Sequence, residues 1–304
     1  IGLVGSEMCI RDRSIISKGV FHMNKNTEIE HSIITKFRPT IYRLFVRAID
    51  EYKLIQDGDK IAVCISGGKD SMLLAKCMEE FQKHGPIRFD VIYMCMNPGY
   101  SQNHLQQILD NAKLLNIPLE VFDTDIFNIV HDIKESPCYL CARMRRGYLY
   151  ANAQKRGCNK IALGHHFDDV IETVMMSIIY GAEYKTMMPK LLSENYPGLE
   201  LIRPLYLVKE ESIMKWCRNN DLHFLQCACR FTEENHNISQ GSSKRQEMKA
   251  LIKQLRKNYP NSDINIFRSF HDVNLNTIVG YHNDSIRYHF LDDYDMKKEK
   301  RKDI

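Results

Sequence analysis

The sequence predicts an α/β protein built on a doubly wound parallel sheet, with helical extensions at both ends. Short apolar runs typical of buried strands alternate with amphipathic, helix-length segments from residue 60 to residue 226. A glycine-rich turn, 66–71, follows the first of these runs, and a polar turn, 164–169, follows the fourth. Strands separated by helices of this length favour a parallel sheet, in which ligands bind beyond the carboxyl ends of the strands.

The individual elements follow from the spacing of apolar residues. A helix is expected over 37–54, and the turn Asp57-Gly58-Asp59 separates it from the first strand. The expected strands are 60–65, 89–96, 119–123, 160–163 and 201–204, with a further short strand at 223–226. The helices expected between them are 71–83, 102–115, 142–155, 168–180 and 209–219. Residues 236–304 are predicted to be helices and loops, including a basic amphipathic stretch, 243–257, and a charged tail, 297–302.

We expect four segments along the chain. Residues 4–13 resemble a translated sequencing adapter, so 1–22 are interpreted as a non-native leader and Cys9 is left out of any metal site. A helical segment, 23–57, precedes the α/β domain, 58–235, and a helical extension with a charged tail, 236–304, follows it. A chain of 304 residues allows one large domain or two modest ones.

Bulk composition sets limits on function. The net charge of +4 is compatible with a nucleic-acid partner without being diagnostic of one. No apolar run approaches the roughly 20 residues that span a bilayer, so no membrane association is expected. Ten cysteines without a secretory signal favour free or metal-bound thiols, and hence a cytoplasmic protein, over a disulfide scaffold.

The turn Ser66-Gly67-Gly68-Lys69-Asp70-Ser71 predicts a phosphate site. A strand-to-helix turn presents backbone N–H groups and a positive helix end to an anion, and adjacent glycines let the backbone approach closely. Lys69 adds a positive charge, and Ser66 and Ser71 add hydroxyl donors. Asp70 would repel a phosphate unless it holds a Mg²⁺ that the phosphates share. The spacing is not that of a Walker A loop.

A cysteine pair, Cys138 and Cys141, precedes the helix expected at 142–155. Such a pair can be half of a zinc site, a redox dithiol or part of an iron–sulfur site, and the intervening polar loop disfavours the dithiol. Cys227 and Cys229 follow the last short strand, so a shared metal site is predicted, either structural zinc or a cluster with one open iron. Five further cysteines, interpreted as small buried hydrophobes, are Cys64, Cys77, Cys95, Cys158 and Cys217.

A third pattern, Leu163-Gly164-His165-His166-Phe167-Asp168-Asp169, follows the fourth strand. Its His and Asp side chains, opposite the phosphate turn, would bind Mg²⁺ or position a phosphate. A helix N-cap by Asp168 is the alternative, and it requires no ligand. The presence of the phosphate turn favours the functional interpretation.

The phosphate turn, the cysteine pair and the His-His-x-Asp-Asp turn follow one another in this order within residues 37–247. The Ser-Gly-Gly-x-Asp-Ser turn is the signature of the PP-loop ATP pyrophosphatases. The whole set closely resembles the tRNA 2-thiocytidine synthetase family. It includes Arg143-Met144-Arg145-Arg146-Gly147, Met188-Pro189-Lys190-Leu191 and Ile202-Arg203-Pro204-Leu205.

The resemblance implies ATP-dependent tRNA thiolation, in which the O2 of an anticodon-loop cytidine, at position 32, is adenylated and then replaced by sulfur. It implies ATP on residues 66–71 with Gly164 and His165, adenine near Met94, and Mg²⁺ on Asp70 and Asp169. It also implies a [4Fe–4S] cluster on Cys138, Cys141 and Cys227, which with Asp70 form the catalytic set. This chain has Cys227-Ala228-Cys229 where the family tends to have Cys-x-x-Cys, so Cys229 is the alternative third ligand.

The expected partners are tRNA, a cysteine desulfurase or other sulfide donor, and a second copy of the chain. Basic residues that would steer the RNA backbone are Arg143, Arg145, Arg146, Lys185 and Lys190. The phosphate turn alone also fits other adenylating enzymes, such as a tRNA 2-thiouridine synthetase or a lysidine synthetase-like ligase with a structural zinc site.

Overall fold

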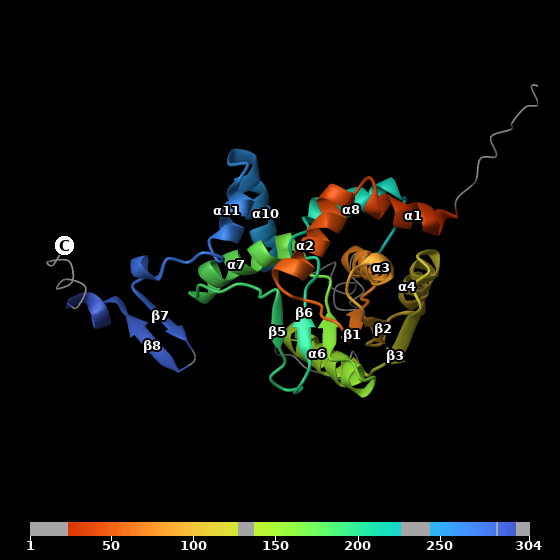
Figure 1. Ribbon diagram of the computed structural model, residues 1–304, viewed down its shortest axis with the longest axis horizontal. Coiled ribbons are helices and arrows are strands. Elements are labelled where there is room, and N and C mark those ends of the chain that lie inside the picture. Colours follow the sequence, from red (N-terminus) through yellow and green to blue (C-terminus); the bar gives the residue numbers. More distant parts are fainter. Residues whose placement is uncertain (1–23, 127–136, 226–243, 284, 296–304) are drawn as a thin grey trace, which may run out of the picture.

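The computed structural model describes residues 24–126, 137–225, 244–283 and 285–295. Its centre is a six-stranded sheet of order β3-β2-β1-β4-β6-β5 (Figure 1). The strands are β1 (Lys60–Cys64), β2 (Asp90–Asn97), β3 (Leu119–Asp123), β4 (Lys160–Ala162), β5 (Lys190–Leu192) and β6 (Glu200–Ile202). All neighbours pair in parallel except β5, which runs antiparallel to β6. Chain order reverses between β1 and β4, so the ligand-binding crevice is expected there.

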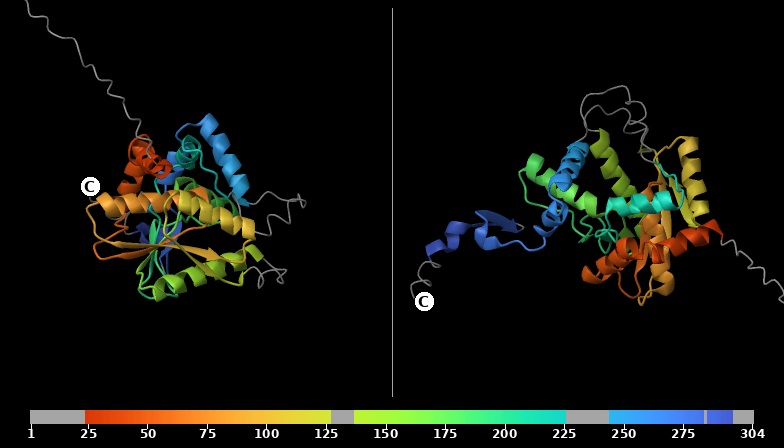
Figure 2. Two further views of the ribbon diagram at one scale, coloured as in Figure 1. Left: turned by 90° about the vertical axis from the view of Figure 1, so that its right-hand side faces the viewer. Right: turned by 90° about the horizontal axis from the view of Figure 1, so that it is seen from above.

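Helices cover both faces of the sheet. Helices α3 (Lys69–His84) and α4 (Gln102–Leu114) lie on one face, and α6 (Pro137–Lys155) lies on the other (Figure 2). Helices α1 (Lys25–Ile34), α2 (Arg43–Glu51) and α8 (Glu210–Asn219) form a further layer outside α3. The predicted doubly wound α/β fold is therefore confirmed.

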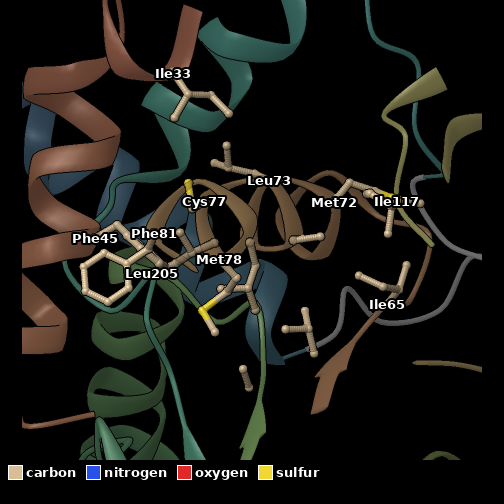
Figure 3. Packing of buried hydrophobic residues seen from close by; sticks show 14 of the residues in the cluster. Ile33, Phe45, Ile65, Met72, Leu73, Cys77, Met78, Phe81, Ile117 and Leu205 are labelled. Atoms are coloured by element: carbon tan, nitrogen blue, oxygen red, sulfur yellow. The ribbon is translucent and has the colours of Figure 1, made fainter. Parts of the chain in front are cut away.

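Helix α3 is the centre of the main core. Residues 71–78 of this helix are all buried, as is typical of a helix enclosed on every side. Figure 3 shows its apolar side chains packed against Phe45 of α2, Ile33 of α1 and Leu205. Lys76, also buried, forms ion pairs with Glu30 and Glu79 and donates to the carbonyl of Leu115 at 2.9 Å. This pairing offsets the cost of burying a charge and ties α1 to α3.

The C-terminal extension has two parts. Helices α10 (Lys244–Asn258) and α11 (Ser262–Arg268) pack on α7 (Phe167–Gly181), with the rings of Phe167 and Phe267 stacked 4.7 Å apart. Strands β7 (Gly280–Asn283) and β8 (Ile286–His289), flanked by 3₁₀ turns at Leu275–Thr277 and Phe290–Asp293, then form a hairpin that projects from the body (Figure 1). None of the helices in the described ranges is long and apolar enough to cross a lipid bilayer.

Several predicted boundaries differ from the structure. The helix expected over 37–54 is divided into a π-helical turn, Arg38–Tyr42, and α2, and α1 lies in the helical segment predicted over 23–57, for which no separate helix bounds were given. Helix α6 begins at Pro137 rather than Ala142, because proline is well suited to the first helical position, so the Cys-x-x-Cys pair lies within the helix.

The strand expected at 223–226 is absent from its described residues, 223–225. Residues 280–283 and 286–289 lie in a region predicted as helices and loops, and they pair as a β-hairpin. Strand β5 was not predicted, because three residues are too few to show a period of two.

Candidate active site

Two loops meet at the carboxyl ends of β1 and β4. Gly164, after β4, lies against the first turn of α3: a Cβ built on it would be 3.0 Å from both the carbonyl carbon of Asp70 and the nitrogen of Ser71. Only a residue without a side chain allows this approach without a shift of the neighbouring backbone. The predicted convergence of the 66–71 and 164–169 turns is therefore present in the structure.

The 66–71 turn is held in shape by its two serines. The Oγ of Ser71 donates to the carbonyl of Gly68 at 2.9 Å and accepts from the backbone N–H of Ser66 at 3.2 Å. Gly67 has φ +84°, in the left-handed region that favours glycine, and a Cβ there would be 2.5 Å from Cγ1 of Ile108. Gly68 is the N-cap of α3, so the turn presents the start of a helix toward the crevice.

Lys69 is bound by two carboxylates. Its Nζ lies 3.1 Å from Oδ2 of Asp70 and 3.1 Å from Oε1 of Glu210, the first residue of α8. Burial works against its charge, but these carboxylates raise the pKa of Lys69 above its ordinary value. Glu210 in turn contacts Lys249 of α10 at 2.6 Å, and the two lysines hold the pKa of Glu210 at about 2 despite its burial.

Asp70 has one carboxylate oxygen without a partner. Its Oδ1 is buried and accepts no hydrogen bond within the described residues, and Nε2 of His166 is 3.7 Å away. Burial raises the pKa of Asp70, although His166 and Lys69 lower it. A buried carboxylate oxygen left unpaired is costly and fits a ligand to Mg²⁺, which binds proteins through one or two carboxylates and completes its shell with phosphate and water.

Asp169 has partners for both oxygens. Oδ2 accepts from the backbone N–H of His166 at 3.0 Å, and the Nδ1 of His166 accepts from the N–H of Asp169 in return, which closes a capping box at the start of α7. Oδ1 accepts from Nη1 of Arg245 at 2.9 Å. The N-cap is thus His166, not the Asp168 considered from sequence. Asp168 instead accepts from the N–H of Glu210.

His165 lines the crevice as a neutral side chain. Burial and the neighbouring guanidinium of Arg203, whose Nε lies 3.3 Å from Nδ1, lower the pKa of His165 to about 4. Burial also lowers the pKa of Arg203 to about 10. A neutral imidazole can donate to a phosphate, but it adds no charge there.

These loops enclose a cavity of about 380 Å³ with a polar and an apolar side. Its polar lining is Ser66, Asp70, Ser71, Arg145, His165, Asp169 and Arg245, and its apolar lining includes Ile65, Met96, Leu149 and Leu163. Met94, predicted to lie near adenine, is fully buried between the sheet and α6 and does not line the cavity. Met96, two residues further along β2 and on the same face, lines it instead.

Helix α6 connects the first cysteine pair to this cavity. Positions 138, 141, 145 and 149 are separated by three or four residues and therefore lie on one face of the helix. Arg145 and Leu149 on that face line the cavity. Positions 138 and 141 thus share a helix face with two residues that line the cavity.

Cys227 and Cys229 lie outside the described residues. Leu225, the last described residue before them, contacts the phosphate turn: its Cδ1 would be 3.4 Å from a Cβ on Gly67. The five cysteines predicted as hydrophobes are buried free thiols, and burial raises the pKa of Cys64 and of Cys95 to about 12. The described side chains contain no group of three His, Cys, Asp or Glu that could hold a metal ion.

Several site residues were missed from the sequence, among them Met96, Glu210, Arg245 and Lys249. Arg245 and Lys249 belong to α10, which was predicted only as a basic amphipathic stretch. Their spacing of four residues indicated one helix face, but nothing local indicated that this face would contact Asp169 and Glu210.

Comparisons with known proteins agree with this geometry. The PP-loop domain family matches residues 40–234. The tRNA-cytidine(32) 2-sulfurtransferase of Paraburkholderia xenovorans is 36% identical over 232 residues, which cover 74% of this chain and 66% of that protein. The protein of the same name from Coxiella burnetii is 34% identical over 241 residues, 77% of this chain and 90% of that protein.

A solved structure has a similar fold. The U34-tRNA thiolase NcsA of Methanococcus maripaludis, determined with its [4Fe–4S] cluster, superposes with a TM-score of 0.58 at 22% identity. The alignment covers 81% of this chain and 78% of NcsA.

Proposed function

The chain belongs to the tRNA-cytidine 2-sulfurtransferase family of PP-loop proteins, and on that premise we propose that it replaces the O2 of a tRNA cytidine with sulfur in an ATP-dependent reaction. The observation that carries the proposal is the cavity itself. One wall is the phosphate turn, and another is the face of α6 that includes positions 138 and 141. A site for activating a base with ATP therefore shares a helix face with two cysteine positions.

The first half of the reaction uses the polar side of the cavity. The triphosphate of ATP binds the N–H groups at the start of α3 and the hydroxyls of Ser66 and Ser71, and adenine lies on the apolar side near Met96. The cytidine O2 attacks the α-phosphate, which forms an O2-adenylated base and releases pyrophosphate. The protein contributes orientation and charge neutralisation rather than covalent catalysis.

The residues present fit a Mg²⁺ ion and an iron–sulfur cluster. Asp70, with its unpartnered Oδ1, would hold Mg²⁺, and the ion supplies neutralisation of the phosphate charge. Cys138, Cys141 and either Cys227 or Cys229 would hold a [4Fe–4S] cluster, which supplies a carrier for sulfide. The position of Leu225 beside Gly67 supports a late cysteine as the third ligand, since Leu225 is the last described residue before Cys227.

In the second half of the reaction, sulfide attacks C2 of the activated base. AMP leaves and carries away the original O2, so the products are 2-thiocytidine, AMP and pyrophosphate. The base has to be unstacked to enter the cavity, which anticodon-loop nucleotides allow at low cost. We propose position 32 from the names of the relatives. We further propose a cysteine desulfurase or similar sulfide donor, a cytoplasmic location and a homodimer.

Thiolation of purified tRNA tests the proposal. Protein purified without oxygen is incubated with unmodified tRNA, ATP, Mg²⁺ and sulfide, and the nucleosides are measured by mass spectrometry. We expect 2-thiocytidine only when ATP is present, with AMP formed in equal amount. Formation of 2-thiouridine or of an amide-linked base, or no thiolated base despite ATP binding, would contradict the proposal. A colourless protein with stoichiometric zinc would contradict the cluster.

A further inference from the structure

Helix α10 presents a row of cations to the loops of the active site. Arg245, Lys249 and Arg256 recur with Ile252 at intervals of three and four residues, so they share one face of the helix. Arg245 contacts Asp169, Lys249 contacts Glu210, and Arg256 contacts Asp168 at 2.6 Å. Ile252, between them, is buried against α7. The C-terminal extension therefore packs on the active site through charged contacts.

Arg245 differs from the other two cations in its surroundings. It lines the cavity together with the phosphate turn, whereas Lys249 and Arg256 do not. Its side chain is 45% exposed, and among the described residues its Nη1 contacts Oδ1 of Asp169 at 2.9 Å and Oε2 of Glu172 at 3.7 Å. Because this guanidinium is half exposed and lies beside the phosphate turn, it can exchange a carboxylate partner for a phosphate. The exchange does not require the guanidinium to be moved from water into the protein interior.

The phosphate turn itself supplies little free positive charge. Lys69 is held between Asp70 and Glu210, and His165 is neutral. ATP brings about four negative charges, of which Mg²⁺ offsets two, so arginines from other elements that line the cavity, Arg145 and Arg245, are the remaining sources of positive charge. Charge-assisted hydrogen bonds from arginine to phosphate are among the stronger ones available.

We propose that Arg245 is a binding residue for the pyrophosphate part of ATP, supplied by α10, and that it exchanges Asp169 for phosphate when the nucleotide binds. The exchange releases Oδ1 of Asp169, which then joins Oδ1 of Asp70 as a ligand for Mg²⁺. Arg245 thus occupies in the nucleotide-free protein the place that the metal takes in the complex. This inference rests on the ATP site of the proposed function.

Nucleotide affinity gives the first test. Dissociation constants of ATP·Mg²⁺ and of AMP are measured by calorimetry for the full chain, Arg245→Gln and Arg245→Lys. Lys253→Gln, on the exposed side of the same helix, is the matched control for loss of one charge. We expect Arg245→Gln to weaken ATP about 10- to 100-fold with AMP unchanged, and Arg245→Lys to weaken it less. Equal weakening of ATP and AMP, or an effect no larger than that of Lys253→Gln, overturns the proposal.

The affinity for metal in the absence of nucleotide gives a second test, in which the loss of Arg245 should strengthen binding rather than weaken it. Mn²⁺ binding is followed by electron paramagnetic resonance in the absence of ATP. Because Arg245 competes with the metal for Asp169, Arg245→Gln should bind Mn²⁺ more tightly than the unaltered chain, and the additional Asp169→Asn change should abolish that gain. If Arg245 only fastened α10 to the body, Arg245→Gln would lower the melting temperature and leave Mn²⁺ binding unchanged or weaker, which overturns the exchange.

These readouts separate this inference from the proposed function. Normal ATP binding by Arg245→Gln together with 2-thiocytidine formation by the unaltered chain would refute the role of Arg245 alone. Selective loss of ATP affinity in a protein that makes no 2-thiocytidine would refute the substrate and retain the role of Arg245.

Discussion

Gly164 lies so close to the backbone of Ser71 that a Cβ on Gly164 would be 3.0 Å from the Ser71 nitrogen. This contact joins the loop after β4 to the first turn of α3 and fixes the distance between the phosphate turn and the His-His-x-Asp-Asp turn. The neighbouring atoms belong to backbone, so they cannot rotate away as a side chain would.

Replacing Gly164 by alanine should therefore separate the two loops. We expect a loss of about 1–3 kcal/mol in the free energy of unfolding, as in other overpacked sites, together with weaker ATP·Mg²⁺ binding. Urea denaturation and calorimetry measure the two effects. Gly181→Ala is the control, because a Cβ at Gly181 meets nothing within 4 Å and alanine favours the helix. If Gly164→Ala and Gly181→Ala had the same free energy of unfolding and the same ATP·Mg²⁺ affinity, the contact between Gly164 and the backbone of α3 would not be tight.

Glu210 should make the protein sensitive to acid. Burial opposes its charge, but Lys249 and Lys69 hold its pKa at about 2, well below that of an unfolded glutamate. A lowered pKa in the folded state stabilises the protein above pH 4.5, and this contribution is lost as the pH falls toward 2. We expect Glu210→Gln to lower the free energy of unfolding at pH 7 by about 2–3 kcal/mol. The variant should also lose less of its free energy of unfolding between pH 4.5 and 2 than the unaltered chain.

Urea denaturation at a series of pH values measures this contribution. Glu211→Gln is the matched control, because Glu211 is largely exposed and forms its ion pair with Lys215, so its loss should cost less than about 0.5 kcal/mol. A Glu210→Gln variant whose stability at pH 7 equals that of Glu211→Gln would argue against the ion-pair network.

The strand-end loops could be predicted from sequence because their chemistry is local. Glycines, a lysine and short polar side chains directly after an apolar run identify a phosphate turn without knowledge of distant residues. The buried thiols of Cys77 and Cys95 followed equally from their positions in apolar elements. The contacts of Arg245 could not be predicted, because Asp169 lies 76 residues earlier in the chain and pairs with it only after α10 packs on α7.

Two further differences between prediction and structure, at Met94 and Met96 and at the β7–β8 hairpin, cannot be resolved from the pattern of a few neighbouring residues. Met94 and Met96 have the same side chain and face the same side of β2, so their sequence pattern cannot show which of them reaches the cavity. Both side chains pack against α6, and Met96 reaches the cavity because it lies two residues nearer the carboxyl end of β2. The hairpin β7–β8 was missed because its strands have only four residues each and are exposed on both faces, although Ile286-Arg287-Tyr288-His289 alternates apolar and polar residues.

Substitution of the cysteines proposed to hold the cluster should abolish thiolation, whereas substitution of a buried structural cysteine should not. Cys138→Ala and Cys141→Ala should remove the absorbance near 400 nm of an iron–sulfur protein and abolish 2-thiocytidine formation, with ATP affinity retained. Cys158→Ser is the control, because Cys158 is a buried thiol away from the cavity lining. Comparison of Cys227→Ala with Cys229→Ala identifies the third ligand as the one whose loss bleaches the protein. Thiolation by Cys138→Ala at the normal rate would refute the proposed cluster.

Met94 and Met96 should respond to the same substitution in opposite ways. Met94 is fully buried and contributes only to packing, so Met94→Ala should cost about 2–4 kcal/mol of stability and leave the nucleotide affinity of the folded protein unchanged. Met96 lines the apolar side of the cavity, so Met96→Ala should weaken ATP and AMP equally, by about 3- to 10-fold, because both contain adenine. This equal effect distinguishes Met96 from Arg245, whose loss should affect ATP alone. Unchanged AMP binding by Met96→Ala would mean that adenine lies elsewhere in the cavity.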